Sequence, residues 1–483
     1  MTVKWITNGL VVLCFLFGNA CSKNPVTGKQ QAFLMSEEKE IAIGKQNDPS
    51  IVASFGLYKD TRIQSFIDQK GQQMARISHR PELPFEFKVL DSPVVNAFAL
   101  PGGFVYFTRG ILAHFNNEAE FAGVLGHEIG HVTARHGAQQ QRNQIVAQVG
   151  LVAGLVLSKE FANFAQQAQQ GMQLLLLKNS RDHESQSDEL GVLYSTKVGY
   201  DSHEMADFFS TLKRLSGDSG AAIPTFLSTH PDPANRYERV HELSKRAQKQ
   251  FGKRRGSLKV NRTPYLRMID GLTYGEDPKQ GFVENNTFYH PELKFEYPVP
   301  NGWQLQNSPQ QVQIGSGDGK AAIIFTIAQG NSLEQVANQL AQDAQLQVSN
   351  KDRRQINGFQ ALTMDAIQTN PQTGQTLQIT STFIQDGSRI FVFHGLAAQQ
   401  DFGRYRSAFA NTSRGYRRLS DPSKLNMQPE RIKVITVQQE GTLANVLGRE
   451  GIPSSRFEEF AILNGMNVGD RVARGSMIKS VTR

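Results

Sequence analysis

Apolar residues recur at helical spacing in the first half of the chain, separated by polar stretches that contain turn residues. The pattern predicts amphipathic helices over residues 36–46 and 58–77. Another helix begins at Asn117, because Asn117 and Glu120 form an Asn version of the capping box, and Gly137 can end it. This half of the chain is therefore predicted to be mainly helical.

Short strands interrupt these helices. Residues 85–90 read as a strand, and residues 104–108 have the β-branched and aromatic content of another. The turn sequence Pro101-Gly102-Gly103 lies directly before the second strand. A small sheet is therefore expected beside the helices.

The second half of the chain changes to a strand-rich pattern. A strand is predicted over residues 321–327, an amphipathic helix over 332–344 and a last helix over about 400–410. Hairpin turns are expected at Asn357-Gly358 and Asp386-Gly387, since such dipeptides favour the tight turns between antiparallel strands. No cluster of catalytic residue types accompanies these elements, which favours a scaffold or partner-binding domain.

The final segment, residues 431–483, has the order strand, helix, helix, strand. The two strands are predicted at 432–437 and near 477–481, and the helices at 442–448 and 455–463.

The predicted fold class is therefore α+β with several domains, because 483 residues exceed one ordinary core. The predicted boundaries are a signal peptide at 1–20, a tether at 21–35, a mainly helical domain with a small sheet at 36–250, a basic linker at 251–285, an α/β sandwich at 286–420 and a small βααβ module at 430–483.

Composition agrees with a folded chain, with 39% hydrophobic and 20% charged residues. The net charge of +8 is concentrated between Leu243 and Arg267, which contains nine Lys or Arg and no acid. This run could rest on an anionic membrane surface, or it could simply be solvated. No basic-aromatic motif or zinc-finger spacing accompanies it, so nucleic acid is not an expected partner.

The first residues predict export. Lys4 is followed by the apolar run 5–17 and then by small residues before Cys21, as in a bacterial signal peptide. Cleavage before Cys21 would place its thiol where lipoproteins are acylated, whereas ordinary cleavage would leave the thiol unlipidated. Cys14 and Cys21 are the only cysteines, so the mature chain can form no internal disulfide and any metal site must use His and carboxylates.

The helix that begins at Asn117 carries His127-Glu128-Ile129-Gly130-His131. His127 and His131 are four residues apart, so both imidazoles leave one helix face and can share one metal ion. Zinc held in this way lowers the pKa of its water, and Glu128 beside it can take the proton. Two surface histidines on a helix are the alternative, since the five-residue pattern also arises by chance.

A second segment, residues 180–194, supplies carboxylates. On a helix Glu184 and Asp188 lie one above the other, and Gly191 would allow a neighbouring helix to approach closely. Glu184 can bind the metal, while Asp188 accepts a hydrogen bond from a ligand histidine and fixes its tautomer. The same spacing is common on solvated helices, so the pair is informative only beside the two histidines.

Four motifs occur in one order. They are Asn96-Ala-Phe-Ala-Leu-Pro-Gly-Gly103, His127-Glu-x-x-His131, Glu184-x-x-x-Asp188 and Thr229-His-Pro-x-Pro-x-x-Arg236. Together they resemble the zinc metallopeptidases related to the CAAX prenyl protease, HtpX, mitochondrial Oma and periplasmic BepA, over roughly residues 30–250. Cys21 with Asn24-Pro-Val-Thr-Gly28 resembles the lipoprotein members of that group.

The resemblance implies a gluzincin-type endopeptidase domain with one zinc ion per chain. It implies His127, His131 and Glu184 as ligands and Glu128 as the general base. Asp188, as above, is expected to support a ligand.

Two further residues take their roles from the resemblance alone. Arg236 would support the ligands beside Asp188. The position that matches His230 lies near the metal in this family, where it stabilises the oxyanion or caps the zinc in a latent state.

Polypeptides are the implied substrates. The expected substrate-binding residues are Asn96, Phe104, Val105 and Tyr106, because a strand beside a protease cleft can pair with an extended peptide. An ordinary core strand is the alternative.

The strand-rich region and the final segment carry two weaker resemblances. Residues 286–420 resemble the PsbP/Mog-like α/β sandwich, and residues 430–483 resemble a LysM peptidoglycan-binding module. Glu440-Gly441-Thr442 replaces the usual Gly-Asp-Thr of LysM modules, and Asn464-Gly465 is also an ordinary turn, so peptidoglycan binding stays an open alternative.

The predicted protein is thus a zinc endopeptidase that cleaves misfolded or misassembled envelope proteins in the periplasm, anchored to the outer membrane through Cys21. The alternative is a non-catalytic, chaperone-like or peptidoglycan-binding protein with a structural or latent zinc site. Glu128 favours the enzyme, because a structural zinc site needs no base beside its first ligand. A chance motif in an adhesive wall protein would bind no stoichiometric zinc.

Overall fold

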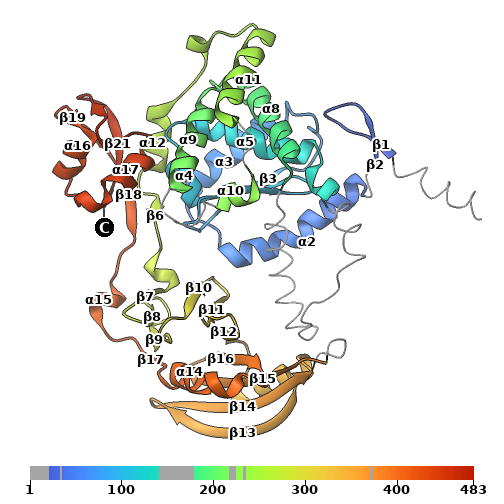
Figure 1. Cartoon of the computed structure of the whole chain (residues 1–483), viewed down its shortest axis with the longest axis vertical. Helices are drawn as coiled ribbons and strands as arrows, with labels where there is room; N and C mark the ends of the chain where they lie inside the picture. Colours follow the sequence, from blue (N-terminus) through green and yellow to red (C-terminus); the bar gives the residue numbers. More distant parts are fainter. Residues whose placement is uncertain are drawn as a thin grey trace, which may run out of the picture.

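The computed structural model describes residues 21–32, 35–140, 179–216, 225–231, 235–369 and 374–482. Three parts are visible in Figure 1: a helical region (residues 35–274), a sandwich (residues 282–418) and a C-terminal module (residues 430–482). Within the described ranges, no helix has the length and apolar character needed to span a bilayer. The predicted signal peptide lies outside the described residues.

The helical region contains a small sheet and a set of packed helices. Its strands are β3 (Glu86–Leu90), β4 (Ala97–Leu100), β5 (Phe104–Thr108) and β6 (Thr273–Tyr274), and its helices are α2 (Glu37–Phe55), α3 (Thr61–Ala75), α4 (Arg109–His114), α5 (Glu118–Thr133), α8 (Arg181–Lys197), α9 (Glu204–Ser216), α10 (Thr225–Thr229), α11 (Arg236–Gln250), η1 (Arg255–Ser257) and α12 (Arg262–Ile269). The sheet order is β3-β5-β4, with β3 parallel and β4 antiparallel to β5.

Helix α5 is the centre of this region, since each of its residues is buried. The predicted cap is confirmed, because the Asn117 side chain accepts a hydrogen bond from the Glu120 N–H at 2.8 Å. The predicted end at Gly137 is wrong: the helix ends at Thr133, and Arg135 adopts a left-handed backbone with φ of 61°. A non-glycine residue in this conformation costs about 1–2 kcal/mol, and here the buried Glu40 holds the Arg135 side chain.

The N-terminal elements differ from their predicted extent. The expected tether contains a hairpin of β1 (Cys21–Lys23) and β2 (Gln30–Ala32). Ser36 caps α2 as the pattern indicated, yet this helix continues well past the predicted residue 46, to Phe55. The turn predicted at Pro101-Gly102-Gly103 is confirmed, because these residues connect β4 to β5. A side chain at Gly102 would lie 2.6 Å from the Ile41 Cα, so α2 packs directly on this turn.

The sandwich is built on a seven-stranded antiparallel sheet and a four-stranded sheet, in the orders β10-β11-β12-β16-β15-β14-β13 and β17-β9-β8-β7. Its elements are η2 (Pro278–Gln280), β7 (Phe282–Glu284), β8 (Thr287–His290), β9 (Phe295–Pro298), β10 (Gln304–Asn307), β11 (Gln311–Gly315), β12 (Ala321–Ala328), α13 (Leu333–Asp343), β13 (Gln347–Ile356), β14 (Phe359–Thr369), β15 (Thr376–Asp386), β16 (Arg389–Ala398), α14 (Phe402–Arg414) and β17 (Arg417–Arg418). The predicted strand 321–327, helix 332–344 and both hairpins are confirmed.

The sandwich is inserted between two paired strands. The chain leaves the helical region after β6 and returns through α15 (Pro422–Leu425) into β18 (Glu430–Thr436), which pairs antiparallel with β6. Both connections to the sandwich therefore begin at one place, as Figure 1 shows near β6 and β18. The predicted basic linker at 251–285 is wrong, because α12 buries Tyr265, Leu266 and Ile269 in the core of the helical region.

The C-terminal module has the predicted order of strand, two helices and strand. After β18 it contains β19 (Gly441–Thr442), α16 (Leu443–Arg449), η3 (Ser454–Arg456), α17 (Phe457–Leu463), β20 (Arg471–Val472) and β21 (Met477–Thr482). Its sheet has the order β21-β18-β6, and its apolar residues belong to the same buried cluster as those of the helical region. The module is thus part of one core with the helical region.

A buried lysine fixes this module next to α5. The Lys479 ammonium donates to the carbonyl oxygens of Ala113 and Phe115 at 2.8 and 3.0 Å. These carbonyls close α4, directly before the segment that caps α5. The Asn464 side chain accepts a hydrogen bond from the Lys479 N–H at 2.7 Å and donates one to the Lys479 carbonyl oxygen at 2.9 Å. Both the side chain and the backbone of Lys479 therefore hold β21 in place.

Candidate metal centre

Helix α5 places two imidazoles side by side. His127 and His131 lie one turn apart on it, and their Nε2 atoms are 3.0 Å apart. Two imidazole nitrogens at this distance face the same small space, and a cation bound there would accept a lone pair from each. The sequence prediction that these two residues share one helix face is confirmed.

Helix α8 supplies the carboxylates across a close helix contact. A side chain at Gly191 would lie 2.9 Å from the Gly123 carbonyl oxygen and 3.0 Å from the His127 nitrogen, so only glycine fits there. The close approach predicted for Gly191 is therefore confirmed. It brings the fully buried Glu184 and Asp188 to the level of His127.

Glu184 and His230 complete a cage with the two imidazoles. The Glu184 carboxylate oxygens lie 3.4 Å from His127 Nε2 and 3.3 Å from His131 Nε2. His230 Nδ1 lies 3.1 Å from Glu184 Oε1 and 3.3 Å from His127 Nε2. One ligand atom from each of the four residues lies within 4.8 Å of all the others.

The short helix α10 presents His230 to the cage. The His230 N–H donates to the Phe226 carbonyl oxygen at 2.8 Å, and its ring stacks on the Phe226 ring with centroids 4.4 Å apart. Phe226 in turn donates its N–H to the Val95 carbonyl oxygen at 3.2 Å. His230 is thereby held against the sheet beside β4.

Asp188 orients His127 from behind. Its Oδ1 lies 2.9 Å from His127 Nδ1, which leaves His127 Nε2 free to face the cage. Arg236 donates to Asp188 at 2.6 and 3.0 Å, and Arg239 donates at 2.8 Å. Burial alone would raise the pKa of Asp188, but the Arg236 guanidinium and His127 lower it to about 2. The carboxylate is therefore charged at neutral pH and gives His127 an ionic partner.

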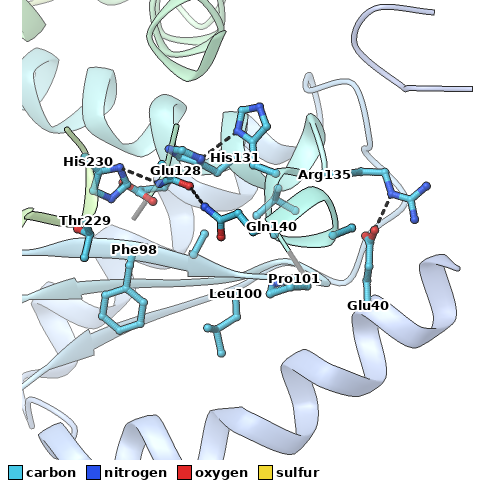
Figure 2. A pocket seen from close by; sticks show the side chains of 16 residues that line it. Glu40, Phe98, Leu100, Pro101, Glu128, His131, Arg135, Gln140, Thr229 and His230 are labelled. Carbon is cyan, nitrogen blue, oxygen red and sulfur yellow. Dashed lines mark hydrogen bonds and ion pairs between the residues drawn. The ribbon is translucent and has the colours of Figure 1, made fainter. Parts of the chain in front are cut away.

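Glu128 lies beside the cage, and both of its buried carboxylate oxygens lack a hydrogen-bond partner within the part of the chain that the structure describes. His230 Nε2 lies 3.7 Å from Glu128 Oε1. Burial raises the pKa of Glu128 above its ordinary value, which moves this carboxyl towards the range useful for proton transfer. Figure 2 shows Glu128, His131 and His230 converging above β4.

The two helix ligands differ in their electrostatic surroundings. Burial would lower the pKa of His127, but the carboxylates of Asp188 and Glu184 raise it to about 9. Burial lowers the pKa of His131 to about 3, and the Glu184 carboxylate, which acts in the opposite direction, does not offset it. Burial would raise the pKa of Glu184, and His230 and His127 lower it well below its ordinary value.

The residues fit a zinc ion. Three imidazole nitrogens and one carboxylate oxygen are a usual donor set for tetrahedral zinc. Among the described residues, Glu184 Oε2 is buried without a hydrogen-bond partner, although His127 Nε2 and Arg236 Nη2 lie 3.4 and 3.5 Å from it. A buried acceptor in that state costs about 1–3 kcal/mol, which a cation in the cage would remove.

The predicted substrate strand requires a correction. Strand β5 is the central strand of its sheet, paired with β3 on one edge and β4 on the other, and Phe104, Val105 and Tyr106 are buried. Its backbone groups are therefore already used, and the expectation that it binds substrate is wrong. Asn96 is also buried, and directly precedes β4.

The strand that borders the site is β4. It is an edge strand, and its residues Phe98 to Leu100 line a cavity of about 60 Å³ together with Glu128, His131 and His230. Sequence reasoning missed this, because order within the sheet is set by pairing between distant segments. Alternation of apolar residues looks the same for an edge and a central strand.

Three supporting residues were also missed. His136 lies 3.0 Å from His131 through their Nδ1 atoms, Arg239 binds Asp188, and Glu40 holds Arg135 at the other end of the cavity (Figure 2). Arg239 could have been predicted from the sequence, because it lies three residues after Arg236 and therefore on the same face of α11. Glu40 is distant in sequence and gave no signal.

Comparison with known proteins gives one family for this region. Residues 62–244 match the model of peptidase family M48. The chain is 34% identical over 178 residues to the mitochondrial metalloendopeptidase OMA1 of Arabidopsis thaliana, which covers 37% of this chain and 35% of that protein. It is 28% identical over 226 residues to the β-barrel assembly-enhancing protease of Yersinia pestis, covering 44% of this chain and 45% of that protein. The chain thus spans less than half of the length of these two relatives.

Solved structures resemble part of the chain only weakly. A cyanobacterial PsbP from Synechocystis covers 27% of this chain and 91% of its own at 12% identity, with a TM-score of 0.23. The yeast Ran-binding protein Mog1p covers 30% of this chain and 99% of its own at 12% identity, also with a TM-score of 0.23. The PsbP/Mog-like assignment of residues 286–420 stays a prediction.

Proposed function

We propose that this chain, in which residues 62–244 form a peptidase family M48 domain, is a zinc-dependent endopeptidase. Its substrates are misfolded or misassembled proteins of the bacterial envelope. The observation that supports this most directly is the buried His127, His131, Glu184 and His230 cage with the unpartnered Glu128 beside it. A site that held zinc only for structure would not bury a second, unpaired carboxylate there.

Each residue has a separate role in this proposal. Bound zinc supplies Lewis-acid polarisation of the scissile carbonyl and activation of water. Glu128 takes a proton and returns it to the leaving amine, for which its raised pKa and dry surroundings are suited. Asp188, fixed by Arg236, holds His127 in the tautomer whose Nε2 faces the cage.

The free edge of β4 binds the substrate backbone. A peptide added to this edge would lie over Phe98 to Leu100 and pass directly below Glu128 and His230. The small cavity volume of about 60 Å³ favours an extended chain over a folded surface loop. Substrates would therefore be locally unfolded, in agreement with a role in quality control.

His230 caps the site in a latent state. With three other ligands in place, its Nδ1 fills the position that a catalytic zinc site keeps open. Its replacement by alanine then raises cleavage, whereas a residue that stabilises the transition state would lower cleavage on replacement. A zinc site with all four ligands supplied by the protein also favours the second candidate, a chaperone-like protein with a latent zinc site.

The test is cleavage of denatured casein by the purified chain, with and without a chelator. Glu128→Gln should retain zinc and lose cleavage by about 10²–10⁴-fold, since it removes the general base. His230→Ala should cleave faster than the wild type. Retained cleavage in Glu128→Gln would refute the assigned base, and no cleavage in either wild type or His230→Ala would favour the chaperone-like candidate.

Three further parts of the proposal concern location. Lipid on Cys21 would anchor the protein to the outer membrane, with the M48 domain in the periplasm and the C-terminal module on peptidoglycan. Metabolic labelling with a fatty acid, compared between wild type and Cys21→Ser, tests the anchor. Sedimentation with purified peptidoglycan at low salt tests the module, and no retention would end that part of the proposal.

A further inference from the structure

His136 contacts a proposed zinc ligand from outside the cage. It follows the left-handed turn at Arg135, which brings the chain back so that the His136 ring lies over His131 with centroids 5.0 Å apart. The His136 side chain is buried. The roles assigned above leave His136 unused, although it touches the ligand as closely as Asp188 touches His127.

The contacts of His136 determine its tautomer. His131 Nε2 faces the cage, so its proton is on Nδ1, and this N–H points at His136 Nδ1 over 3.0 Å. His136 Nδ1 must therefore accept, which leaves the His136 proton on Nε2. That nitrogen lies 2.9 Å from Gln186 Oε1, which can only accept. Donors and acceptors thus alternate without conflict from Gln186 to the cage.

The His136 ring is also fixed in orientation. It stacks on the His183 ring with centroids 4.2 Å apart and 12° between the planes. His183 Nε2 lies 3.3 Å from Gln139 Oε1, and Ser187 Oγ lies 3.3 Å from His136 Nδ1.

We propose that His136 is a positioning residue that fixes the tautomer and orientation of His131, with Gln186 fixing His136 in turn. The two helix ligands then have unlike supports: an ionic one for His127, from Asp188, and a neutral one for His131. This inference rests on the zinc site of the proposed function. It requires no peptide cleavage, because its consequence is the affinity of the chain for metal.

The test measures zinc affinity by competition with a chromophoric chelator, on the full chain. His136→Phe keeps the ring and removes the acceptor, and should weaken zinc binding by about 10–100-fold. His136→Asn, whose side-chain oxygen can stand near the position of Nδ1, should recover most of that loss. The visible spectrum of the cobalt-loaded chain should change in His136→Phe and return towards wild type in His136→Asn.

Gln186 offers a matched pair of variants. Gln186→Leu removes the acceptor and should weaken zinc binding several-fold, less than His136→Phe, because His136 can still accept. Gln186→Glu retains an acceptor oxygen and should show no loss. Thermal unfolding of each metal-free variant separates lost affinity from lost folding, and if His136→Phe does not fold the Gln186 pair decides alone.

Wild-type affinity with an unchanged cobalt spectrum in His136→Phe, or equal losses in Gln186→Leu and Gln186→Glu, would overturn the proposal. A wild-type chain that takes up zinc without cleaving protein would refute the endopeptidase and leave this test intact. A wild-type chain that takes up no zinc would remove both.

Discussion

The C-terminal module and the sandwich both lie outside residues 62–244, which match the M48 family model, yet they are attached in opposite ways. The module shares a sheet and a buried cluster with the helical region, and Lys479 binds the end of α4 directly before α5. The sandwich has its own cores on the two faces of its sheet. Its ties to the helical region include a long bond of 3.4 Å from Gln280 to the Asp91 carbonyl oxygen.

This difference indicates which part can influence the metal centre. The C-terminal module contacts the segment directly before α5, the helix that carries His127 and His131. The sandwich begins and ends beside the paired strands β6 and β18, which belong to the sheet of the C-terminal module. A shared core transmits displacement because it is close-packed, whereas two chain crossings do not.

The largest expected effect is at the centre of the helical region. Asp188→Ala leaves the buried Arg236 without its main ionic partner and should destabilise the helical region by about 3–5 kcal/mol. It should also weaken zinc binding by about 10–100-fold. Denaturant unfolding of the metal-free chain and chelator competition measure the two losses.

Asp201→Ala is the matched control for that variant. Asp201 pairs with Arg255, whose side chain is 58% exposed and remains solvated when the carboxylate is removed. The expected loss is about 1 kcal/mol, with no change in zinc affinity. Equal losses in the two variants would show that the burial of the Asp188 network has no energetic consequence.

The next prediction compares the two attachments directly. Phe460 is fully buried in the C-terminal module and Phe391 is buried in the sandwich, and each change to alanine should cost about 3–5 kcal/mol. In calorimetry Phe460→Ala should lower the transition of the helical region and module together. Phe391→Ala should lower only the sandwich transition. A separate transition for the module would contradict the shared core.

Lowering the pH should destabilise the sandwich through its buried residue His394. Burial lowers the pKa of His394 in the sandwich from 6.5 to about 4, so this ring is neutral in the folded state and protonates first in the unfolded state. The stability that the neutral His394 ring contributes to the folded sandwich is therefore fully present above pH 6.5. It is lost as the pH falls towards 4. The full loss is about 3 kcal/mol.

His394→Gln tests that contribution, since an amide can keep the bond to Ser381 Oγ without titrating. Between pH 6.5 and 4 the sandwich of this variant should lose less stability than that of the wild type, whereas the helical region should respond equally in both. Parallel pH profiles of the two sandwiches would contradict the assignment.

The smallest effect is expected on removal of the sandwich. Replacing residues 278–427 by a short glycine-rich linker should leave zinc affinity within about twofold of the wild type, because β6 and β18 remain paired. Chelator competition on the shortened chain measures this. A large loss of zinc affinity would show that the sandwich supports the metal centre despite its separate cores.

The sequence by itself determined the local parts of this protein. Helical spacing put His127 and His131 on one helix face, and the Asn117 cap marked the start of α5. Glu184 and Asp188 fell on one face of α8, and Gly191 allows α8 to approach α5 closely. Turn chemistry likewise predicted the hairpins at Asn357 and Asp386. These features depend on residues within about one or two helical turns of one another, where covalent geometry and backbone hydrogen bonding set the positions.

Only the tertiary structure decided which distant segments meet. It made β4 rather than β5 the edge beside the cavity, placed Glu40 against Arg135 and buried α12 where charge suggested a solvated linker. It also put the sandwich between two paired strands and Lys479 against α4. Pairing and burial of this kind depend on the summed packing of the whole core, which the spacing of residues along one segment does not encode.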